Sequence, residues 1–229
     1  MMQAGKLYII PTPIGNLEDI TIRAINYLKE SDVILMEDTR VSAKLFHHYN
    51  ITPQIKIPFH KFNEHIIVEK IIKLIKEEKK VSLISDAGTP GISDPAYLLV
   101  KHCLLNQIEV ETLPGSTAFV PALVNSGLPS HNFVFEGFLP VKKGRTKKLL
   151  QLKDETRTMI FYESPHKLLK TLNDFINIFG QQRQASVSKE ISKIHEQTIR
   201  GTLLEIYNHF SKSKNIKGEF VIIIAGNNN

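Results

Sequence analysis

The chain has 229 residues, of which 42% are hydrophobic and 23% are charged, and these fractions are typical of an ordinary globular protein. No apolar run approaches the roughly 18 residues of a membrane span, and the N-terminus lacks the features of a secretory signal, so neither is expected. The formal net charge of +6 permits a polyanionic partner without requiring one.

The first part of the chain alternates short apolar strands with amphipathic helices. Strands are predicted at residues 6–10, 32–36, 55–59, 81–85, 108–113 and 132–135. Helices are predicted at residues 20–30, 41–49, 63–78, 94–106 and 118–126, with Thr21 or Asp19 capping the first of them. This alternation predicts a mainly parallel sheet with helices on both faces.

The character of the sequence changes after residue 137. Residues 138–144 are predicted to form a hinge, because a proline, a glycine and a cluster of basic side chains occur together in this region. Beyond it, strands are predicted at residues 156–162, 184–188, 194–200 and 219–225, and helices at residues 164–179 and 203–210. The predicted fold class is therefore α/β, with one α/β domain over residues 1–137 and a second over residues 145–229.

Polar, glycine-rich or proline-rich turns follow four of the predicted strands, at residues 11–15, 37–40, 86–91 and 114–115. The carboxyl ends of parallel strands share one edge of a sheet, so these turns predict a ligand crevice at that edge. The Gly-x-Gly-x-x-Gly fingerprint and the phosphate-binding loop are both absent, which argues against a pyrophosphate ligand. The alternative is a tight structural turn in which Asp94 caps the next helix.

Neither cysteine nor histidine indicates a redox or metal site. Cys103, the single cysteine, lies in an apolar segment and is predicted to be a buried core thiol. A lone cysteine excludes an intrachain disulfide and fits a reducing cytoplasm. The nine histidines show no spacing typical of zinc ligands, so no metal is expected.

Several segments resemble the tetrapyrrole methylase superfamily. The resemblance lies in residues 6–25, 33–40, 83–95, 113–118 and 133–140. Within the superfamily, residues 161–168, 189–196 and 218–224 are similar to the bacterial branch that methylates a cytidine 2′-oxygen in 16S ribosomal RNA. Ser85, Asp86 and Ala87 stand where the wider family often has Gly-Asp-Pro, and this departure also matches the RNA-modifying branch.

The resemblance implies S-adenosylmethionine as the cofactor, held in a cleft between the two α/β domains. It also implies a homodimer whose partner is the 16S RNA of the small ribosomal subunit. The implied cofactor contacts are Pro13, Ile14, Gly15, Asp86, Ala87, Gly88, Thr89, Thr117 and Ala118, with Phe161 or Tyr162 and Val187 or Ser188 from the second domain. Two other functions remain open, namely a tetrapyrrole methyltransferase of the same fold and a non-catalytic RNA-binding module.

Methyl transfer to a ribose hydroxyl calls for a base that accepts the hydroxyl proton. Glu37 and Asp38 are adjacent acids at the predicted crevice, and neighbouring side chains at the end of a strand point to opposite sides. One of them is therefore expected to face the substrate and the other to pair with Arg40. Candidates from the second domain are Lys189, Lys193 and Glu196.

The basic cluster near the predicted hinge is the candidate RNA-binding segment. Basic side chains neutralise phosphates and make affinity depend on salt. The predicted contacts are Lys142, Lys143, Arg145, Lys147 and Lys148, with help from Lys212, Lys214 and Lys217. The alternative for each of them is an ordinary solvated surface charge.

Overall fold

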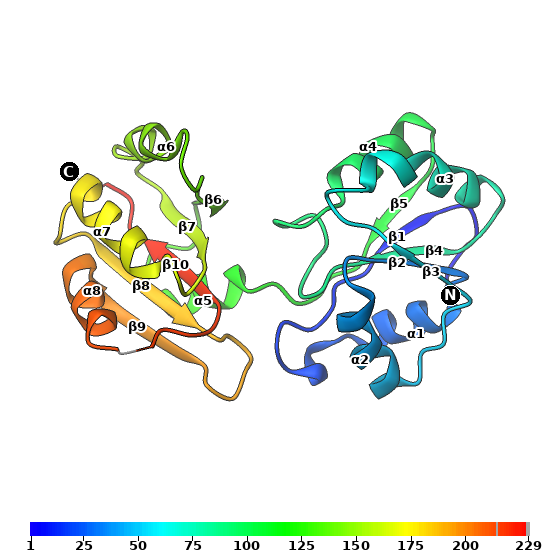
Figure 1. Ribbon diagram of the computed structural model, residues 1–229, viewed down its shortest axis with the longest axis horizontal. Coiled ribbons are helices and arrows are strands. Elements are labelled where there is room, and N and C mark those ends of the chain that lie inside the picture. Colours follow the sequence, from blue (N-terminus) through cyan, green and yellow to red (C-terminus); the bar gives the residue numbers. More distant parts are fainter. Residues whose placement is uncertain (214, 228–229) are drawn as a thin grey trace. The chain divides into compact units, whose positions relative to one another are not determined.

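The computed structural model describes residues 1–213 and 215–227 (Figure 1). The chain forms two compact units, which we call unit 1 (Met1–Thr117) and unit 2 (Ala118–Asn229). Among the described residues, no helix is both long enough and apolar enough to cross a membrane. The predicted α/β class is confirmed, because each unit contains its own five-stranded sheet with helices packed on it.

Unit 1 is built on a parallel sheet with the strand order β3-β2-β4-β1-β5. The strands are β1 (Leu7–Ile9), β2 (Val33–Met36), β3 (Ile55–Pro58), β4 (Val81–Ile84) and β5 (Val110–Thr112). The helices are the short 3-10 turn η1 (Leu17–Asp19), α1 (Ile22–Glu30), α2 (Thr39–Tyr49), α3 (Glu64–Lys76) and α4 (Tyr97–Leu105). Figure 1 shows α1 and α2 on one face of the strands and α3 and α4 on the other.

The central strands of this sheet are buried on both faces, which is why their sequences read as apolar runs. Ser82 interrupts the run of β4, and its hydroxyl is satisfied by the Ser31 hydroxyl at 2.6 Å. Cys103 lies in the core between the sheet and helices α3 and α4. Burial raises the pKa of the Cys103 thiol to about 12, so the prediction of a core thiol is confirmed.

Helix α1 begins two residues after the predicted start at residue 20, and α4 begins three residues after the predicted start at residue 94. The Thr21 hydroxyl accepts a hydrogen bond from the N–H of Ala24, so Thr21, one of the two predicted caps, is the N-cap. In α4 the residue before the first helical turn is Ala96, which makes no side-chain capping bond. Asp94 precedes Pro95, and a residue before proline is disfavoured in the helical conformation. The helix predicted from residue 94 therefore begins at Tyr97, and the structure contradicts the alternative in which Asp94 caps it.

Unit 2 contains a mixed sheet with the strand order β6-β7-β10-β8-β9, in which β6 and β7 are parallel and the other pairs are antiparallel. The strands are β6 (Phe133–Phe138), β7 (Thr158–Glu163), β8 (Gln184–Lys189), β9 (Gln197–Thr202) and β10 (Phe220–Ile224). The helices are α5 (Phe119–Ser126), α6 (Arg145–Gln151), α7 (Leu168–Phe179) and α8 (Leu203–Ser211). A large apolar core lies between the sheet and helices α7 and α8, and α5 packs against β8, β9 and β10.

The units divide at Thr117, earlier in the chain than the break expected at residues 138–144. Helix α5 and strand β6 belong to unit 2, because β6 pairs with β7 and α5 packs on the second sheet. Residues 139–144 are the connection from β6 to α6. Strand and helix patterns look alike whether a strand closes one sheet or opens the next, so the sequence could not locate this boundary.

Candidate functional site

The turns that follow β1 and β4 are hydrogen-bonded to each other. The N–H of Thr12 donates to the Gly88 carbonyl at 2.9 Å, and the N–H of Gly88 donates to the Thr12 carbonyl at 3.0 Å. The buried Thr12 hydroxyl also donates to the Ser85 carbonyl at 3.1 Å. Gly88 has a φ of +83°, a left-handed conformation that glycine adopts without strain. A β-carbon at Gly88 would lie 3.4 Å from Ile14 Cγ2, so the Ile14 side chain lies directly against this turn.

The turn after β5 joins the same cluster. The Thr89 hydroxyl donates to the Ser116 carbonyl at 2.9 Å. Gly115 lies against the ring of Pro11, since a β-carbon at Gly115 would come within 2.5 Å of Pro11 Cβ. Three chain reversals that are far apart in sequence therefore meet at the carboxyl edge of the sheet, as predicted from their sequences.

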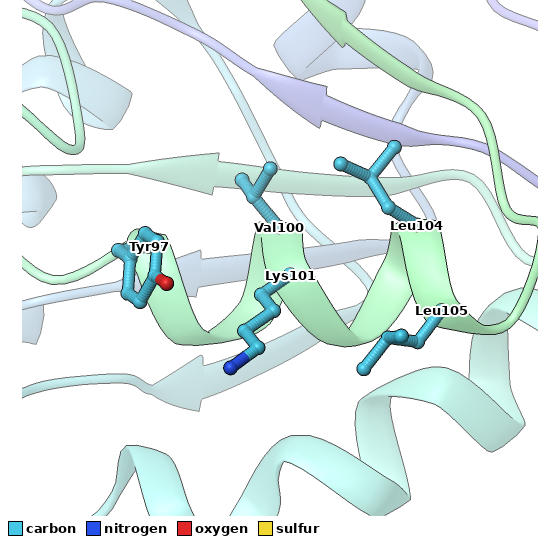
Figure 2. A pocket seen from close by; sticks show the side chains of 5 residues that line it. All are labelled: Tyr97, Val100, Lys101, Leu104 and Leu105. Atoms are coloured by element: carbon cyan, nitrogen blue, oxygen red, sulfur yellow. The ribbon is translucent and has the colours of Figure 1, made fainter.

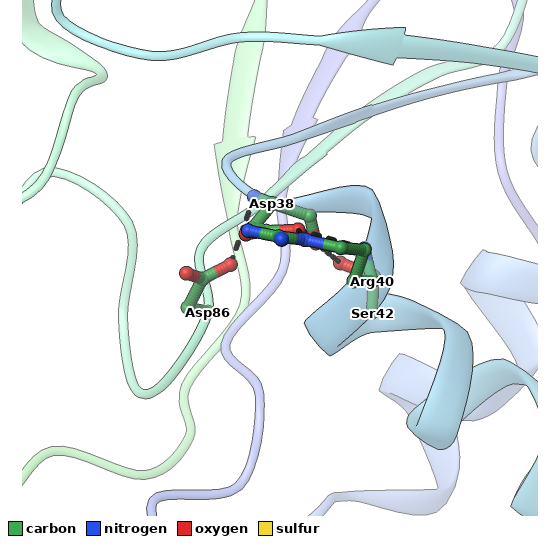
Figure 3. Close-up of polar contacts among 4 residues, drawn as sticks. All are labelled: Asp38, Arg40, Ser42 and Asp86. Carbon is green, nitrogen blue, oxygen red and sulfur yellow. Dashed lines mark hydrogen bonds and ion pairs between the residues drawn. The ribbon is translucent and has the colours of Figure 1, made fainter.

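The fourth turn, after β2, is attached through Asp86 (Figure 3). The N–H of Asp38 donates to Asp86 Oδ1 at 2.9 Å. Asp38 is also the N-cap of α2, because its Oδ1 accepts the Arg40 N–H at 2.8 Å. Its Oδ2 holds the Arg40 guanidinium at 2.6 Å. The prediction that one of the two adjacent acids pairs with Arg40 is confirmed, and the paired acid is Asp38.

The acids at this edge differ in how readily they ionise. The hydrogen bonds from Arg40 lower the pKa of Asp38 to about 2, which makes Asp38 a weak base. Burial and then the charge of Asp86 raise the pKa of Glu37. Burial also raises the pKa of Asp86, and the charge of Asp38 adds to that effect. A proton acceptor works best when its pKa lies near the working pH, so Glu37 is the better base of the two predicted acids.

Asp94 is a member of this site that the sequence reading missed. Burial, followed by the charges of Glu37 and Asp86, raises the pKa of Asp94 to about 7. Its carboxyl therefore belongs to the same electrostatic cluster as theirs, which we call the acidic edge (Glu37, Asp86 and Asp94). The available signal was Asp94 directly before Pro95, a position that cannot start a helix easily.

The acidic edge fits a cationic methyl donor. The chain carries a net charge of +6, yet three carboxyl groups gather where the turns meet, and their charges attract a positively charged ligand. Asp86 uses its Oδ1 for the N–H of Asp38, and its other oxygen can accept hydroxyl donors of a ribose. Gly88 removes a side chain from the middle of the cluster. The residues present therefore suit S-adenosylmethionine, which joins a sulfonium to a nucleoside.

The remaining predicted cofactor residues of unit 1 lie in the same turns. Pro13 and Gly15 flank Ile14, Ala87 lies between Asp86 and Gly88, and Thr117 follows Ser116. Ala118 is the first residue of unit 2 and precedes helix α5. Their part in binding stays a prediction.

The predicted cofactor residues of unit 2 divide between the two faces of its sheet. Phe161 and Val187 point into the core beneath α7 and α8, and the Phe161 ring lies 4.9 Å from that of Phe175. The structure therefore contradicts a cofactor contact by either side chain. Tyr162 lies on the opposite face and is half-buried. Ser188 is buried on that face too, and its hydroxyl bonds to that of Thr198 at 2.9 Å.

Lys193 is an ion-paired residue of unit 2. Its amine lies 2.9 Å from a carboxylate oxygen of Glu190 and 2.9 Å from one of Glu219. Burial favours the neutral amine, but the bonds to the two carboxylates outweigh it and raise the pKa of Lys193. A permanently protonated amine cannot accept a proton at neutral pH. This geometry argues against Lys193 as the base.

The basic cluster divides into structural and exposed members. Arg145 is buried, donates to Asp174 at 2.8 Å and to Thr171 at 2.7 Å, and is therefore not available to RNA. The structure contradicts that prediction. Lys148 pairs with Glu136 at 2.6 Å. The exposed lysines are Lys142, Lys143, Lys147, Lys212 and Lys217, whereas Lys214 lies outside the described residues.

Helix α4 carries an apolar surface on its outer side (Figure 2). Tyr97, Leu104 and Leu105 are largely exposed, and with Val100 and Lys101 they line a shallow hollow. Exposed apolar patches of this kind mark interaction surfaces. We call these five residues the α4 surface.

Comparisons with known proteins show the family to which the chain belongs. A family model described as Tetrapyrrole (Corrin/Porphyrin) Methylases matches residues 6–207. A protein of Thermotoga maritima named Ribosomal RNA small subunit methyltransferase I is 45% identical over 222 residues, which cover 97% of this chain and 99% of that protein. A Synechocystis protein of the same name is 46% identical over 224 residues, or 97% of this chain and 79% of that protein.

A solved structure shows the same fold at low sequence identity. The uroporphyrin-III C-methyltransferase of Thermus thermophilus, in complex with S-adenosylhomocysteine, has a TM-score of 0.64 and is 20% identical. The match covers 95% of this chain and 96% of that one. At this identity the likeness concerns the fold alone.

Proposed function

Because this chain belongs to the tetrapyrrole methylase family, we propose that it transfers the methyl group of S-adenosylmethionine to a cytidine 2′-oxygen in 16S ribosomal RNA. The observation that carries the RNA substrate is the identity of 42–46% to proteins named Ribosomal RNA small subunit methyltransferase I, over nearly the whole chain. The choice of a cytidine 2′-oxygen is supported by the motifs shared with that branch. We expect the protein in the cytoplasm, where ribosomal subunits are assembled.

The turns at the carboxyl edge of unit 1 are proposed to hold the cofactor. When bound, S-adenosylmethionine supplies an electrophilic methyl group on a positively charged sulfur. Ile14 and Gly88 provide an apolar side chain and an open backbone next to each other. Asp86 accepts hydrogen bonds from the cofactor through the oxygen that does not hold Asp38. The mutual hydrogen bonds of Thr12 and Gly88 keep this cradle rigid, which lowers the entropy cost of binding.

Glu37 is proposed to accept the proton of the 2′-hydroxyl. It is the acid of the adjacent pair that is not held by Arg40, and its pKa is raised by burial and by Asp86. Asp94 adjusts this site, because its protonation state sets the negative charge that Glu37 and the cofactor experience. Positioning of the hydroxyl in line with the sulfur–methyl bond supplies a further large part of the rate, on the order of 7–11 kcal/mol.

A homodimer is proposed as the working form, with the α4 surface as its contact. The family resemblance implies a dimer, and the α4 surface is a largely exposed apolar patch in unit 1. A charged side chain in such a contact costs several kcal/mol when it has no partner. Leu104→Glu is therefore expected to give a monomer by light scattering, whereas Leu150→Glu, at an exposed leucine of α6, leaves the mass unchanged.

Labelled S-adenosylmethionine tests the proposed reaction directly. Purified protein should transfer the label to small ribosomal subunits from cells that lack the gene, and mass spectrometry of nuclease digests should find one 2′-O-methylated cytidine. The solved structures of similar fold include tetrapyrrole methyltransferases, so a uroporphyrinoid serves as the competing acceptor. Label in the porphyrinoid and none in RNA would replace this proposal with a tetrapyrrole activity. Absence of transfer to either acceptor would favour a non-catalytic module.

A further inference from the structure

Strand β6 contains an irregularity that changes the face on which its last residue lies. Its pairing with β7 runs from Phe135 opposite Ile160 to Gly137 opposite Phe161, so Glu136 is an extra residue in the strand. Gly137, which follows the extra residue, has a φ of +60°, a left-handed conformation that glycine adopts without strain. In regular pairing, Phe135 and Phe138 would point to opposite faces of the sheet. The bulge brings Phe138 opposite Tyr162, on the face that carries Phe135.

A row of aromatic rings results on this face of unit 2. The Phe119 and Phe135 rings lie 4.9 Å apart, and the Phe135 and Tyr162 rings lie 5.2 Å apart. Phe138 completes the row, with its ring 5.6 Å from that of Tyr162. Phe138 is the most exposed of these four rings, at 58%, whereas Phe119, Phe135 and Tyr162 are partly buried. An exposed ring supported from behind by other rings is a surface on which a flat ligand can stack.

Two lysines are held beside this ring by an anchored loop. Arg145 holds the segment that follows Phe138, because its guanidinium donates to the Pro140 carbonyl at 3.3 Å. The same guanidinium donates to the carboxylate of Asp174 in α7 at 2.8 Å. Lys142 and Lys143 lie on this loop and are exposed. In the described part of the chain, no carboxylate forms an ion pair with either of them.

The bulge itself is fixed to the helix that follows the loop. Glu136, the extra residue, pairs with Lys148 of α6 at 2.6 Å, and its side chain is nearly buried. Both ends of the loop are therefore attached to the body of unit 2, through Glu136 and through Arg145. A ring and two free cations on a fixed loop match the two recognition elements of single-stranded nucleic acid, which are base stacking and phosphate contact.

We propose that Phe138 stacks on an unpaired base of the RNA and that Lys142 and Lys143 bind the neighbouring phosphates. This inference rests on the RNA substrate proposed above, and it names the surface of unit 2 that engages the RNA. It gives the bulge at Glu136 a function, because a regular strand would turn the Phe138 ring to the other face.

Binding to small ribosomal subunits from cells that lack the gene tests the stacking role. Phe138→Ala is expected to weaken binding about tenfold, because stacking of one base on an aromatic ring is lost. Phe138→Tyr should restore it. The matched control is Val141→Ala, in the loop that follows Phe138 and at a similar exposure of 56%, and it should bind as the wild type does. The affinity for S-adenosylhomocysteine should be the same in all four proteins, which shows that they are folded.

The salt dependence of the same binding reaction tests the lysines. The double variant Lys142→Gln with Lys143→Gln should reduce the slope of log affinity against log salt by about 2, whereas Phe138→Ala should leave the slope unchanged. Equal binding by the Phe138→Ala and Val141→Ala proteins would overturn the proposal. So would a change from dimer to monomer on Phe138→Ala, since the ring would then belong to a subunit contact. A wild-type protein that neither binds nor methylates the subunits would overturn the proposed function as well, before any variant is compared.

Discussion

The two units carry their proposed functional groups on different parts of their sheets. In unit 1 the groups lie in turns at the carboxyl ends of parallel strands, and much of what they offer is backbone: Gly88, Gly115 and the paired Thr12 and Gly88 amides. In unit 2 they lie on one face of a mixed sheet and on the loop after β6, and what they offer is side chains such as Phe138 and Lys142. The two units also differ in charge, since acids gather at the edge of the first and lysines on the loop of the second.

This difference shows that a site at a strand end and a site on a sheet face depend on different features of the fold. A strand end stays at the sheet edge if the strand shifts by one residue. A side chain on a face moves to the opposite face under the same shift. Unit 2 contains such a shift at Glu136, and there it determines where Phe138 lies. Substitutions at the edge should therefore act on chemistry and cofactor affinity, whereas substitutions in unit 2 should act on stability or RNA binding.

The largest effect is expected for the proposed base of unit 1. Glu37→Gln should lower the single-turnover rate of methyl transfer by about 10²- to 10⁴-fold, because the hydroxyl proton loses its acceptor. Affinity for S-adenosylhomocysteine should stay near the wild-type value. The matched control is Asp38→Asn, since Asp38 is committed to Arg40 and has a pKa of about 2. A normal single-turnover rate for the Glu37→Gln protein, with cofactor binding intact, would exclude Glu37 as the base.

The second effect concerns stability and separates buried from exposed cations of unit 2. Arg145→Ala should lower the free energy of unfolding by about 2–4 kcal/mol, because Asp174 loses its ion-pair partner and Thr171 keeps only its bond to Glu163. Arg157→Ala removes an ion pair of similar length, 2.7 Å to Glu155, but Arg157 is exposed and the loss should stay below about 1 kcal/mol. Urea unfolding of both variants measures the difference. Equal losses would contradict the structural role given to Arg145.

Much of unit 1 was predictable from its sequence, for a physical reason. Strands β2 and β4 are buried on both faces, so their apolar runs are conspicuous, and the turns that follow them contain the residues that chain reversal demands. The pairing of one adjacent acid with Arg40 followed from the alternation of side chains at a strand end. The sequence did not show that Asp94 belongs to this edge, because an aspartate shortly before a helix also fits a helix cap, and only the structure places the N-cap at Ala96.

Unit 2 was less predictable, because its sites depend on which face each residue occupies. Phe161 and Tyr162 are adjacent and both aromatic, yet only Phe161 lies in the core. Arg145 and Lys142 belong to one basic cluster, and only three-dimensional packing shows that Arg145 is buried against Asp174. The boundary between the units was misplaced for a related reason, since β6 pairs with a strand that comes later in the chain.

The third effect tests the rigidity of the cradle in unit 1. Gly115→Ala would bring a β-carbon within 2.5 Å of Pro11, so it should cost about 1–3 kcal/mol of stability and also weaken S-adenosylhomocysteine binding. Gly127→Ala, in unit 2, is the control, because a β-carbon there meets no atom within 4 Å. Its left-handed φ of +72° makes it cost about 1–2 kcal/mol, but cofactor affinity should not change. Calorimetric titration measures the S-adenosylhomocysteine affinity of both variants. Equal affinities would show that the turn at Gly115 is not part of the binding site.

The smallest effect is electrostatic and concerns Asp94. Its pKa of about 7 lies above the ordinary value of 3.8, so between these values the folded protein binds a proton that the unfolded chain does not. The stability that this proton contributes is complete below about pH 4 and is lost as the pH rises through 7. Asp94→Asn should therefore flatten the fall in unfolding free energy over that range, by about 1 kcal/mol after solvent screening.

The ionisation of Asp94 can also be followed through the affinities of two cofactor forms that differ in charge. S-adenosylmethionine carries a sulfonium, whereas S-adenosylhomocysteine carries a neutral thioether at that position. Ionisation of Asp94 adds negative charge to the acidic edge, so the ratio of S-adenosylmethionine to S-adenosylhomocysteine affinity should rise about threefold between pH 6 and pH 8. The Asp94→Asn protein should show a constant ratio. A ratio that rises equally in both proteins would assign the pH dependence to another group, and Glu37 would be the next to test, because burial raises its pKa as well.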